Sequence, residues 1–395
     1  MSSTPWTSRS NMATALPQSF LDRLPEGNWT FFVRSPGRIN IIGEHLDYNG
    51  GYVLPAAIDR AIYFAVEKGE GTNIRCHALD IDERATFDPL ADQPTGKRWV
   101  DYLLGICRQF RLLGYEIPAF NIAFGGDLPI GGGLSSSAAL EGGMAFLLND
   151  FFGRPLDRLQ LATMCQRSSN DFLDIPTGIM DQFASLHGRA GKALLLDTLS
   201  LNYEEIAIEI PDYSFILINS QVEHELPESG YKDRVRECKM ALNTIQEKFP
   251  EIKHLAFNSP GKIKAVYHLS PHLQDRALYL CGEQARVEYT AKNLKESHGS
   301  SVGKFLNDSH EGQRDLYEVS CPEIDFLQSF AQWHPDVAGS RLMGGGFGGC
   351  TLNLVHDSYV EGFVEDVKRL YLRKYKIEAT AIPVKIADGT EVIQA

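Results

Sequence analysis

The order of the apolar segments constrains the fold of this chain more than any other feature of its sequence. Short segments rich in β-branched and aromatic residues predict strands. They lie at 58–66, 120–124, 193–196, 206–210, 215–218, 351–355 and 379–386. Helix-like patterns lie at 103–113, 138–152, 156–168, 231–248 and 323–333. Because strands and helices intermingle without strict alternation, we predict an α+β fold rather than a doubly wound parallel sheet.

The length of the chain predicts two domains. It has 395 residues, of which 43% are hydrophobic and 23% charged, an ordinary globular profile. We place a mobile tail at 1–19, an N-terminal domain at 20–205 and a C-terminal domain at 206–395. Nothing near residue 205 is rich enough in proline or glycine to be a free linker. We therefore expect the two domains to be packed, with the active site in the cleft between them.

Charge, hydropathy and cysteine spacing exclude several classes of function. The formal net charge of −13 argues against binding to nucleic acid or to an anionic membrane, and no apolar run reaches membrane-spanning length. An anionic substrate would therefore need a local positive site or a metal ion. The seven cysteines are scattered singly, which predicts reduced thiols and a cytoplasmic protein. The tail lacks the apolar core of a secretory signal. The oligomeric state stays open, and a monomer is plausible.

Residues 37–51 form the most informative polar motif. An apolar run at 39–42 leads into Glu44, His45 and Asp47, and two glycines close the turn. Two carboxylates and an imidazole side by side need hydrogen-bond donors, and the hydroxyls of a sugar are such donors. The residues alone leave open the alternative of a solvated acidic turn.

Residues 125–141 predict a phosphate-binding loop. Glycines and a run of three serines precede a helix-like stretch, and a helix N-terminus offers unpaired N–H groups to an anion. The serines are good N-cap residues, and their hydroxyls could also bind Mg²⁺. The Gly-Lys-Ser/Thr tripeptide of a Walker A loop is absent, and Ser136 stands where a dinucleotide fingerprint has its third glycine. An ordinary glycine-rich helix cap is the structural alternative.

Two further segments suggest chemistry. Residues 344–349 read Gly-Gly-Gly-Phe-Gly-Gly, but a strand-like segment follows them, whereas a Rossmann turn leads into a helix. His-Arg-Asp and Asp-Phe-Gly are both absent, which argues against a protein kinase. Asp181 is a lone acid between apolar neighbours, and a partly buried carboxylate needs a cation or donors. Taken alone, Asp181 is as consistent with a structural acid as with a catalytic one.

Together these motifs resemble those of the galactokinases, sugar kinases of the GHMP superfamily. The similar segments are Gly-Glu-His-Leu-Asp-Tyr-Asn-Gly-Gly at 43–51, Pro-Ile-Gly-Gly-Gly-Leu-Ser-Ser-Ser-Ala at 129–138, Gly-Ile-Met-Asp-Gln at 178–182 and the glycine loop at 344–349. The resemblance runs from about residue 30 to the C-terminus. It implies the two-domain GHMP fold, with a mixed sheet in the N-terminal domain and an α+β C-terminal domain. It also implies transfer of phosphate from ATP, with Mg²⁺, to the C1 hydroxyl of galactose.

The resemblance also implies a role for each matching residue. Asp181 would be the base, and Arg38 its cationic partner. The residues implied for the sugar are Glu44, His45, Asp47, Gly178 and Tyr231. Those implied for ATP are Gly131, Gly132, Gly133, Leu134, Ser135, Ser136, Ser137, Ala138, Gly345 and Gly346, with Trp99 as a candidate for the adenine pocket. The metal would lie at Ser137 or Ser136. Gly230 and Val235 depart from the family pattern of Glu and Arg.

Two alternatives to a galactose kinase remain. A kinase of a related sugar, such as N-acetylgalactosamine or galacturonate, would share most motifs, but Asn49 favours galactose because the N-acetylgalactosamine kinases typically have Cys there. A non-catalytic sensor of galactose and ATP is the second alternative. Some sensors of this fold lack Ser-Ala in the segment matching residues 129–138, which we call the serine loop, so the presence of Ser137 and Ala138 favours an enzyme.

Overall fold

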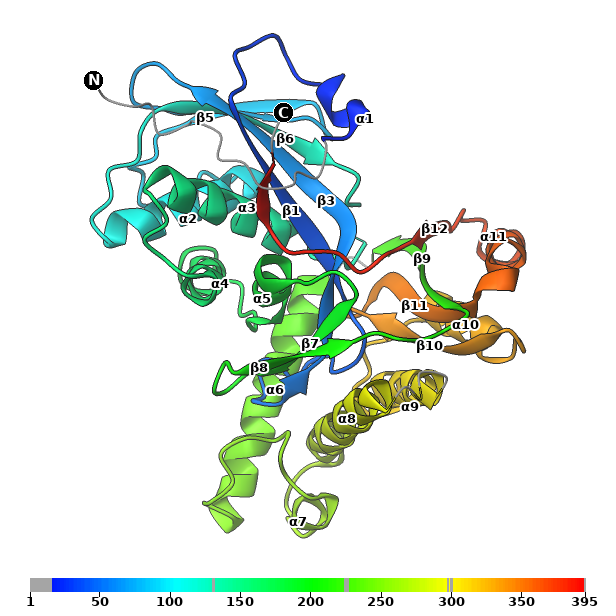
Figure 1. Cartoon of the computed structure of the whole chain (residues 1–395). Coiled ribbons are helices and arrows are strands. Elements are labelled where there is room, and N and C mark those ends of the chain that lie inside the picture. The colour runs from blue at the N-terminus through cyan, green and yellow to red at the C-terminus, as the bar shows by residue number, and fades with distance from the viewer. Residues whose placement is uncertain (1–15, 130–131, 224–226, 297, 299–300, 394–395) are drawn as a thin grey trace.

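A six-stranded mixed sheet forms the first half of the molecule (Figure 1). The structure is a computed structural model that describes residues 16–129, 132–223, 227–296, 298 and 301–393. The strands, in spatial order, are β13 (Glu391–Ile393), β1 (Phe31–Asn40), β3 (Pro55–Lys68), β6 (Phe120–Gly126), β4 (Ile74–Ala78) and β5 (Glu83–Phe87). All neighbours pair antiparallel except β4 and β6, which run parallel. The predicted mixed N-terminal sheet is therefore confirmed.

Helices cover one face of this sheet, and a short helix covers the other. The first layer contains α2 (Arg98–Leu112), α3 (Ser136–Phe151), α4 (Arg158–Arg167), a π-helical turn (Ser168–Phe172) and α5 (Met180–His187). On β1, Phe31 and Val33 belong to the main core, whereas Phe32 packs with Phe20 of α1 (Gln18–Leu21) on the opposite side. Because side chains alternate along a strand, β1 is buried on both faces.

A second sheet, of four antiparallel strands, forms the other half. Its order is β10 (Val337–Met343), β11 (Gly348–His356), β9 (Tyr213–Glu223) and β12 (Thr380–Pro383). Its helices are α6 (Pro227–Lys248), α7 (Pro260–Lys264), α8 (Pro271–Lys295), α9 (Val302–Asp315), α10 (Pro322–Gln332) and α11 (Val360–Tyr375), the last preceded by a 3₁₀ turn (Asp357–Tyr359). α10 and α11 enclose a separate small core with β9 and β11. The α+β fold class is therefore confirmed.

A small three-stranded sheet lies where the two halves meet (Figure 1). It contains β2 (Tyr52–Val53), β7 (Lys192–Asp197) and β8 (Tyr203–Ala207), all antiparallel. The boundary that we placed after residue 205 falls inside β8, where Glu205 pairs with Leu194. In addition, β13 returns from the end of the chain to the first sheet. The exact domain limits stay a prediction, and no single cut assigns every strand to its own sheet.

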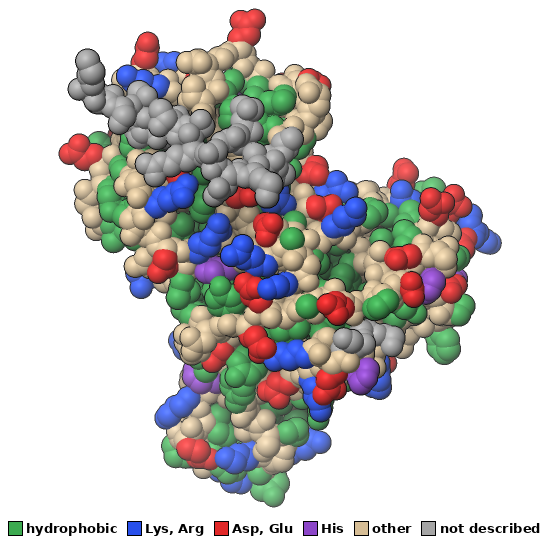
Figure 2. Space-filling model, viewed as in Figure 1, with side chains coloured by type: hydrophobic (Ala, Val, Ile, Leu, Met, Phe, Trp, Pro, Cys, Tyr) green, Lys and Arg blue, Asp and Glu red, His purple; other side chains and the backbone are tan. Residues whose placement is uncertain are grey.

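The predicted tail and the cysteines can be compared with the structure. Residues 1–15 lie outside the described residues, and the last two residues of the predicted tail, Gln18 and Ser19, are part of α1. All seven cysteines are free and buried. Across the described ranges, no helix has both the length and the apolar character to cross a bilayer. On the face seen in Figure 2, acidic and basic side chains are interspersed.

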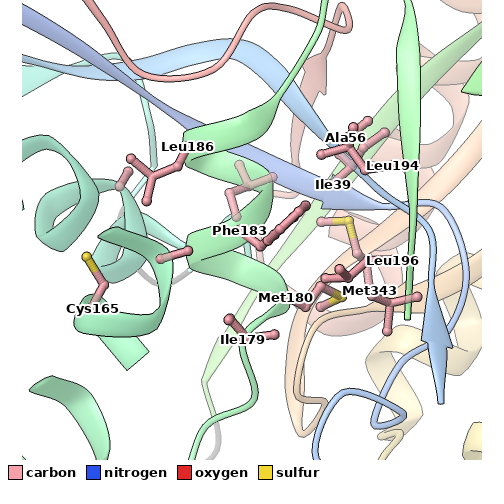
Figure 3. Packing of buried hydrophobic residues seen from close by; sticks show 14 of the residues in the cluster. Ile39, Ala56, Cys165, Ile179, Met180, Phe183, Leu186, Leu194, Leu196 and Met343 are labelled. Carbon is pink, nitrogen blue, oxygen red and sulfur yellow. The ribbon is translucent and has the colours of Figure 1, made fainter. Parts of the chain in front are cut away.

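The packing of α5 fixes the position of the acid that it carries. Met180 and Phe183 are buried and point toward the strands around Ile39, whereas the buried Leu186 lies on the side of α5 nearer Cys165, as Figure 3 shows. Gln182, Ala184 and Ser185 are buried as well, so α5 is enclosed on more than one side. Asp181, in the first turn of α5, is not among its buried residues, and a quarter of its side chain, 26%, is exposed.

Candidate active site

Asp181 lies at the centre of a small hydrogen-bond cluster. Arg38 Nε donates to Asp181 Oδ1 at 2.8 Å, and Ser135 Oγ donates to Oδ2 at 2.5 Å. Arg38 is buried, and its Nη1 donates to the carbonyl oxygen of Gly133 at 2.6 Å. The structure thus brings together the predicted acid and its predicted cation. It also ties both to the serine loop, because Arg38 and Asp181 each contact a residue of that loop.

Glu44 connects the sugar motif to the second half of the molecule. Its Oε1 accepts from the backbone N–H of Gly344 at 2.8 Å and from Arg341 Nη2 at 3.1 Å. Arg341 is completely buried, and it also donates to the backbone carbonyls of Asn40 and Ile41 at the end of β1. A buried guanidinium with several carbonyl partners is satisfied in a fixed orientation. Glu44 therefore anchors the glycine loop in addition to lining the cavity.

His45 is held in an unusual backbone conformation and is buried. Its φ of 66° lies in the left-handed region, which a non-glycine residue adopts only at a local cost. Nδ1 lies 2.8 Å from the hydroxyl of Tyr48. Burial, together with the positive charges of Arg234 and Arg341, lowers the pKa of His45 to about 3. The imidazole is therefore neutral at physiological pH.

Asp47 faces the other acids of the site. Burial, and then the carboxylates of Asp181 and Glu44, raise the pKa of Asp47 to about 7. The absence of a side chain on Gly178 makes room for the carboxylate of Asp47, because a Cβ on Gly178 would lie 1.9 Å from Asp47 Oδ2. The predicted sugar residue Gly178 is thus required as a glycine by the position of Asp47. A carboxylate with a raised pKa in a cleft is a common feature of functional sites.

These residues line a cavity of about 260 Å³ between the two halves of the molecule. Its lining contains the predicted residues Arg38, Glu44, His45, Asp47, Asp181, Tyr231 and Gly345. It also contains residues to which we assigned no role from the sequence: Tyr48, Ile175, Pro176, Thr177, Met180, Lys232 and Gly344. The cavity combines three carboxylates, one guanidinium, the ammonium group of Lys232 and aromatic rings. Such a mixture suits a small, neutral ligand rich in hydroxyl groups.

The serine loop lies at the start of α3. Ser135 occupies the N-cap position with a left-handed φ of 60°, but its side chain makes no capping hydrogen bond. Our expectation of a serine cap is therefore wrong for Ser135, because its hydroxyl is bound to Asp181 instead. Ser136 and Ser137 lie in the first helical turn and are partly exposed. The first N–H groups of α3 consequently lack a side-chain cap and are available to an anion.

The rest of the serine loop is partly hidden from solvent. Leu134 and Ala138 are buried, and the carbonyl oxygen of Leu134 accepts from the backbone N–H of Arg38 at 3.2 Å. A Cβ on Gly132 would lie 3.3 Å from Asn219 Nδ2 of β9. Gly131, which we predicted to bind ATP, lies outside the described residues.

The glycine loop of residues 344–349 packs against the serine loop. A Cβ on Gly344 would lie 3.5 Å from the Cα of Gly133, so the two backbones approach closely. Gly345 borders the cavity next to the ring of Tyr231. Gly346 instead faces the backbone of Val319, since a Cβ there would lie 2.5 Å from its carbonyl oxygen. Two loops more than 200 residues apart in the chain thus meet at one site.

Trp99 lies outside the lining of this cavity. It is in the first turn of α2, where its indole Nε1 donates to Glu83 Oε2 at 3.0 Å and its ring packs edge-on against Phe124. These contacts are those of a packed, half-buried tryptophan. A role in an adenine pocket stays a prediction.

Sequence reasoning missed four residues with a clear place in the site. Arg341 anchors Glu44, Tyr48 and Tyr317 extend the hydrogen bonding of His45, and Lys232 borders the cavity. Arg341 could have been noticed as a lone cation within an apolar strand just before the glycine loop. Tyr317 lies in a segment that matches the family pattern, where we expected packing, but its hydrogen bonds could not be predicted because its partners come from distant segments.

Family models match three parts of the chain. The galactokinase galactose-binding signature matches residues 18–68. The N-terminal domain model of the GHMP kinases matches residues 101–189, and the C-terminal model matches residues 290–372. The first contains the Glu44–Asp47 motif, the second the serine loop and Asp181, and the third the glycine loop.

Several proteins are similar over most of the chain. A galactokinase from Thermotoga neapolitana is 36% identical over 361 residues, covering 91% of this chain and 99% of that protein. One from Clostridium beijerinckii is 37% identical over 376 residues, covering 91% and 94%. The crystal structure of Lactococcus lactis galactokinase complexed with galactose superposes with a TM-score of 0.87 at 33% identity, covering 91% and 94%. A mevalonate kinase at 16% identity and a TM-score of 0.66 shares the fold. The chain therefore belongs to the galactokinase family of the GHMP kinase superfamily.

Proposed function

We propose that Asp181 and Arg38 carry the phosphorylation of α-D-galactose by ATP at the C1 hydroxyl. In this reaction the C1 oxygen forms a bond to the γ-phosphorus, and the bond from that phosphorus to the bridging oxygen of ADP breaks. The hydroxyl proton passes to Asp181, so the products are galactose 1-phosphate and ADP. The observation that supports this assignment best is the position of Asp181, which borders the cavity and is hydrogen bonded to the serine loop.

Arg38 and Ser135 orient Asp181 for this role. Each donates to a different carboxylate oxygen, which leaves the remaining lone pairs free to receive a proton. The fixed positive charge of Arg38 also lies where negative charge develops during transfer. Since phosphoryl transfer proceeds through a loose transition state, positioning and charge neutralisation contribute more than activation of the nucleophile.

The start of α3 would hold the phosphates. The first turn of α3 lacks a side-chain cap, and Gly133, just before this helix, packs against Gly344 of the glycine loop. Mg²⁺ binds through few protein oxygens and keeps phosphate oxygens and waters as its other ligands. Ser136 and Ser137, which are partly exposed, fit that requirement. Bound Mg²⁺ would neutralise phosphate charge, as the net acidity of the chain demands.

The turn of residues 44–47 would hold the sugar. Asp47 and the second oxygen of Glu44 accept from sugar hydroxyls, and His45 and Tyr231 complete the contacts. Gly178 contributes by leaving space for Asp47. Because a buried acceptor left without its donor is costly, a sugar whose hydroxyl points elsewhere is disfavoured.

A panel of sugars tests this proposal directly. Purified protein is given MgATP and galactose, glucose, N-acetylgalactosamine or galacturonate, and release of ADP is measured. We expect the highest kcat/KM with galactose. Phosphorus NMR of the product should show a phosphate coupled to the anomeric proton. A 6-phosphate would contradict the assignment of Asp181 to the C1 side, and a preference for another sugar would contradict the assignment of the 44–47 turn.

A further inference from the structure

A chain of hydrogen bonds runs from the cavity into the core behind it. His45 Nδ1 lies 2.8 Å from Tyr48 Oη, and Tyr48 Oη lies 2.9 Å from Tyr317 Oη. Tyr317 Oη in turn lies 3.1 Å from Cys238 Sγ. Tyr317 follows α9, and Cys238 belongs to α6; both are buried.

We propose that Tyr48, Tyr317 and Cys238 are positioning residues that hold His45 in the tautomer with its proton on Nε2. His45 then donates a hydrogen bond to an oxygen of the sugar. The inference rests on the proposed function in one respect, which is that His45 contacts the sugar.

The direction of these hydrogen bonds follows from the donor and acceptor strengths of the groups involved. Each hydroxyl carries one proton, so the chain can run in only two ways. In the first, Cys238 donates to Tyr317, Tyr317 donates to Tyr48, and Tyr48 donates to His45 Nδ1. In the second, the donor and acceptor of every bond are exchanged. The first direction pairs a phenol, the best donor present, with an unprotonated imidazole nitrogen, the best acceptor. The reverse makes a phenol oxygen, a poorer acceptor, accept from the imidazole N–H, and the thiol of Cys238 is a weak partner in either direction.

In the tautomer that we propose, the proton on Nε2 is left for a ligand. Nε2 is buried and has no hydrogen-bond partner among the described residues, although the ring of His45 lines the cavity. A buried N–H without a partner is unfavourable, so a ligand oxygen in the cavity is its natural acceptor. Glu44 and Asp47, when ionised, only accept, whereas every sugar hydroxyl both donates and accepts. A donor on His45 therefore supplies what the carboxylates cannot.

Because the His45 ring is neutral, it carries a single proton, on either Nδ1 or Nε2. Because burial and the two arginines lower the pKa of His45 to about 3, the doubly protonated ring is not populated near neutral pH. The ring consequently carries one proton, and its position is decided by the hydrogen bond at Nδ1.

Nitrogen NMR of the full-length protein labelled with ¹⁵N-histidine tests the tautomer without any sugar or ATP. The His45 signals are assigned by their loss in His45→Gln. We expect a protonated Nε2 and an unprotonated Nδ1 in the wild type, and a shift of population toward protonated Nδ1 in Tyr48→Phe. A wild-type ring protonated on Nδ1, or an unchanged tautomer in Tyr48→Phe, would overturn the proposal. This measurement is informative even if the assigned sugar proves wrong.

Kinetics of Tyr317→Phe test the consequence for the sugar, because Tyr317 does not line the cavity. We expect KM for galactose to rise roughly fivefold to tenfold, the effect of a weakened neutral hydrogen bond, with KM for ATP unchanged. Tyr371→Phe is the matched control, since Tyr371 is also fully buried and donates one hydrogen bond, to Ser220 O at 2.9 Å. Equal changes in both variants would overturn the proposal.

Cys238 offers a second test that does not depend on the folding of the tyrosine variants. Cys238→Ala removes the outer end of the chain, whereas Cys238→Ser replaces the thiol with a better donor. We expect Cys238→Ala to raise KM for galactose about twofold and Cys238→Ser to retain the wild-type value. A serine variant as impaired as the alanine variant would contradict the role of Cys238 as a donor.

Discussion

The sugar motif of residues 43–51 and the serine loop border the same site, but they differ in how many of their polar groups already have partners within the protein. In the sugar motif and its surroundings, Glu44, His45 and Asp181 already have protein partners. At the start of α3, by contrast, Ser136 and Ser137 are partly exposed and the helix lacks a side-chain cap. One side is therefore preorganised, whereas the other is completed by its ligand.

This difference explains which residues should tolerate substitution. A preorganised group is part of a network, so its loss disturbs the neighbours that it satisfied. Loss of a group that has no partner until the ligand binds affects mainly the affinity for that ligand. Ser135 is the exception within its loop, because its hydroxyl belongs to the network of Asp181.

Substitution of Asp181 should have the largest effect on turnover. We expect Asp181→Ala to lose roughly 10²–10⁴ in kcat, because both the proton acceptor and the partner of Arg38 are removed. Binding of ATP, measured by calorimetry, should persist. Asp181→Asn is the matched control, since it keeps the shape but cannot accept the proton. A kcat within about tenfold of the wild type in both variants would show that Asp181 is structural.

Arg341→Met should have the largest effect on stability. It leaves the carboxylate of Glu44 buried without its cation, and breaking a buried pair typically costs about 3–5 kcal/mol. Chemical denaturation measures the loss. The double variant Arg341→Met with Glu44→Gln should recover part of it, since no unpaired charge remains. If the single variant unfolds like the wild type, the two halves are not joined through Arg341.

The stability of the ligand-free protein should depend on the ionisation of Asp47. The pKa of Asp47 is raised from 3.8 to about 7, so between these values the folded protein binds a proton that the unfolded chain has lost. The stability that the protonated Asp47 contributes is fully present below about pH 4 and is lost as the pH rises through about 7. Asp47→Asn should therefore gain stability over the wild type between pH 5 and 8, on the order of a few kcal/mol. A constant difference across this range would contradict the shift.

Asp47→Ala should weaken the sugar site selectively. We expect KM for galactose to rise about tenfold to a hundredfold and the preference for galactose over glucose to narrow, because an acceptor of a sugar hydroxyl is lost. KM for ATP should stay nearly unchanged. If the variant instead loses ATP and keeps its sugar preference, the 44–47 turn belongs to the nucleotide side.

Ser135→Ala should have a smaller effect on activity. Whether kcat or KM for ATP changes shows whether Ser135 acts through Asp181 or binds phosphate. If Ser135 acts through Asp181, kcat falls several-fold and KM for ATP changes little. If Ser135 binds phosphate, KM for ATP rises instead. Ser137→Ala serves as the comparison, since its effect should appear in the affinity for MgATP.

The sequence predicted the local features of the molecule better than its long-range contacts. The apolar run at 39–42, the helix after the serines and the proximity of Arg38 to Asp181 were all predicted, the last through family resemblance. The partner of Glu44 was not, because Gly344 lies 300 residues away and only the fold brings the two together. Ser135 was assigned to phosphate for a similar reason: nothing local shows that Asp181 competes for its hydroxyl.

The pairing of β13 with β1 has a consequence for the synthesis of the protein. Residues 32–34 pair with residues 391–393, so this edge of β1 remains open until β13 has left the ribosome, long after β1 itself. An unpaired edge strand is a template for association with other chains. During translation, the nascent first half therefore exposes an unpaired strand edge until β13 covers it. Deletion of β13 should consequently promote aggregation.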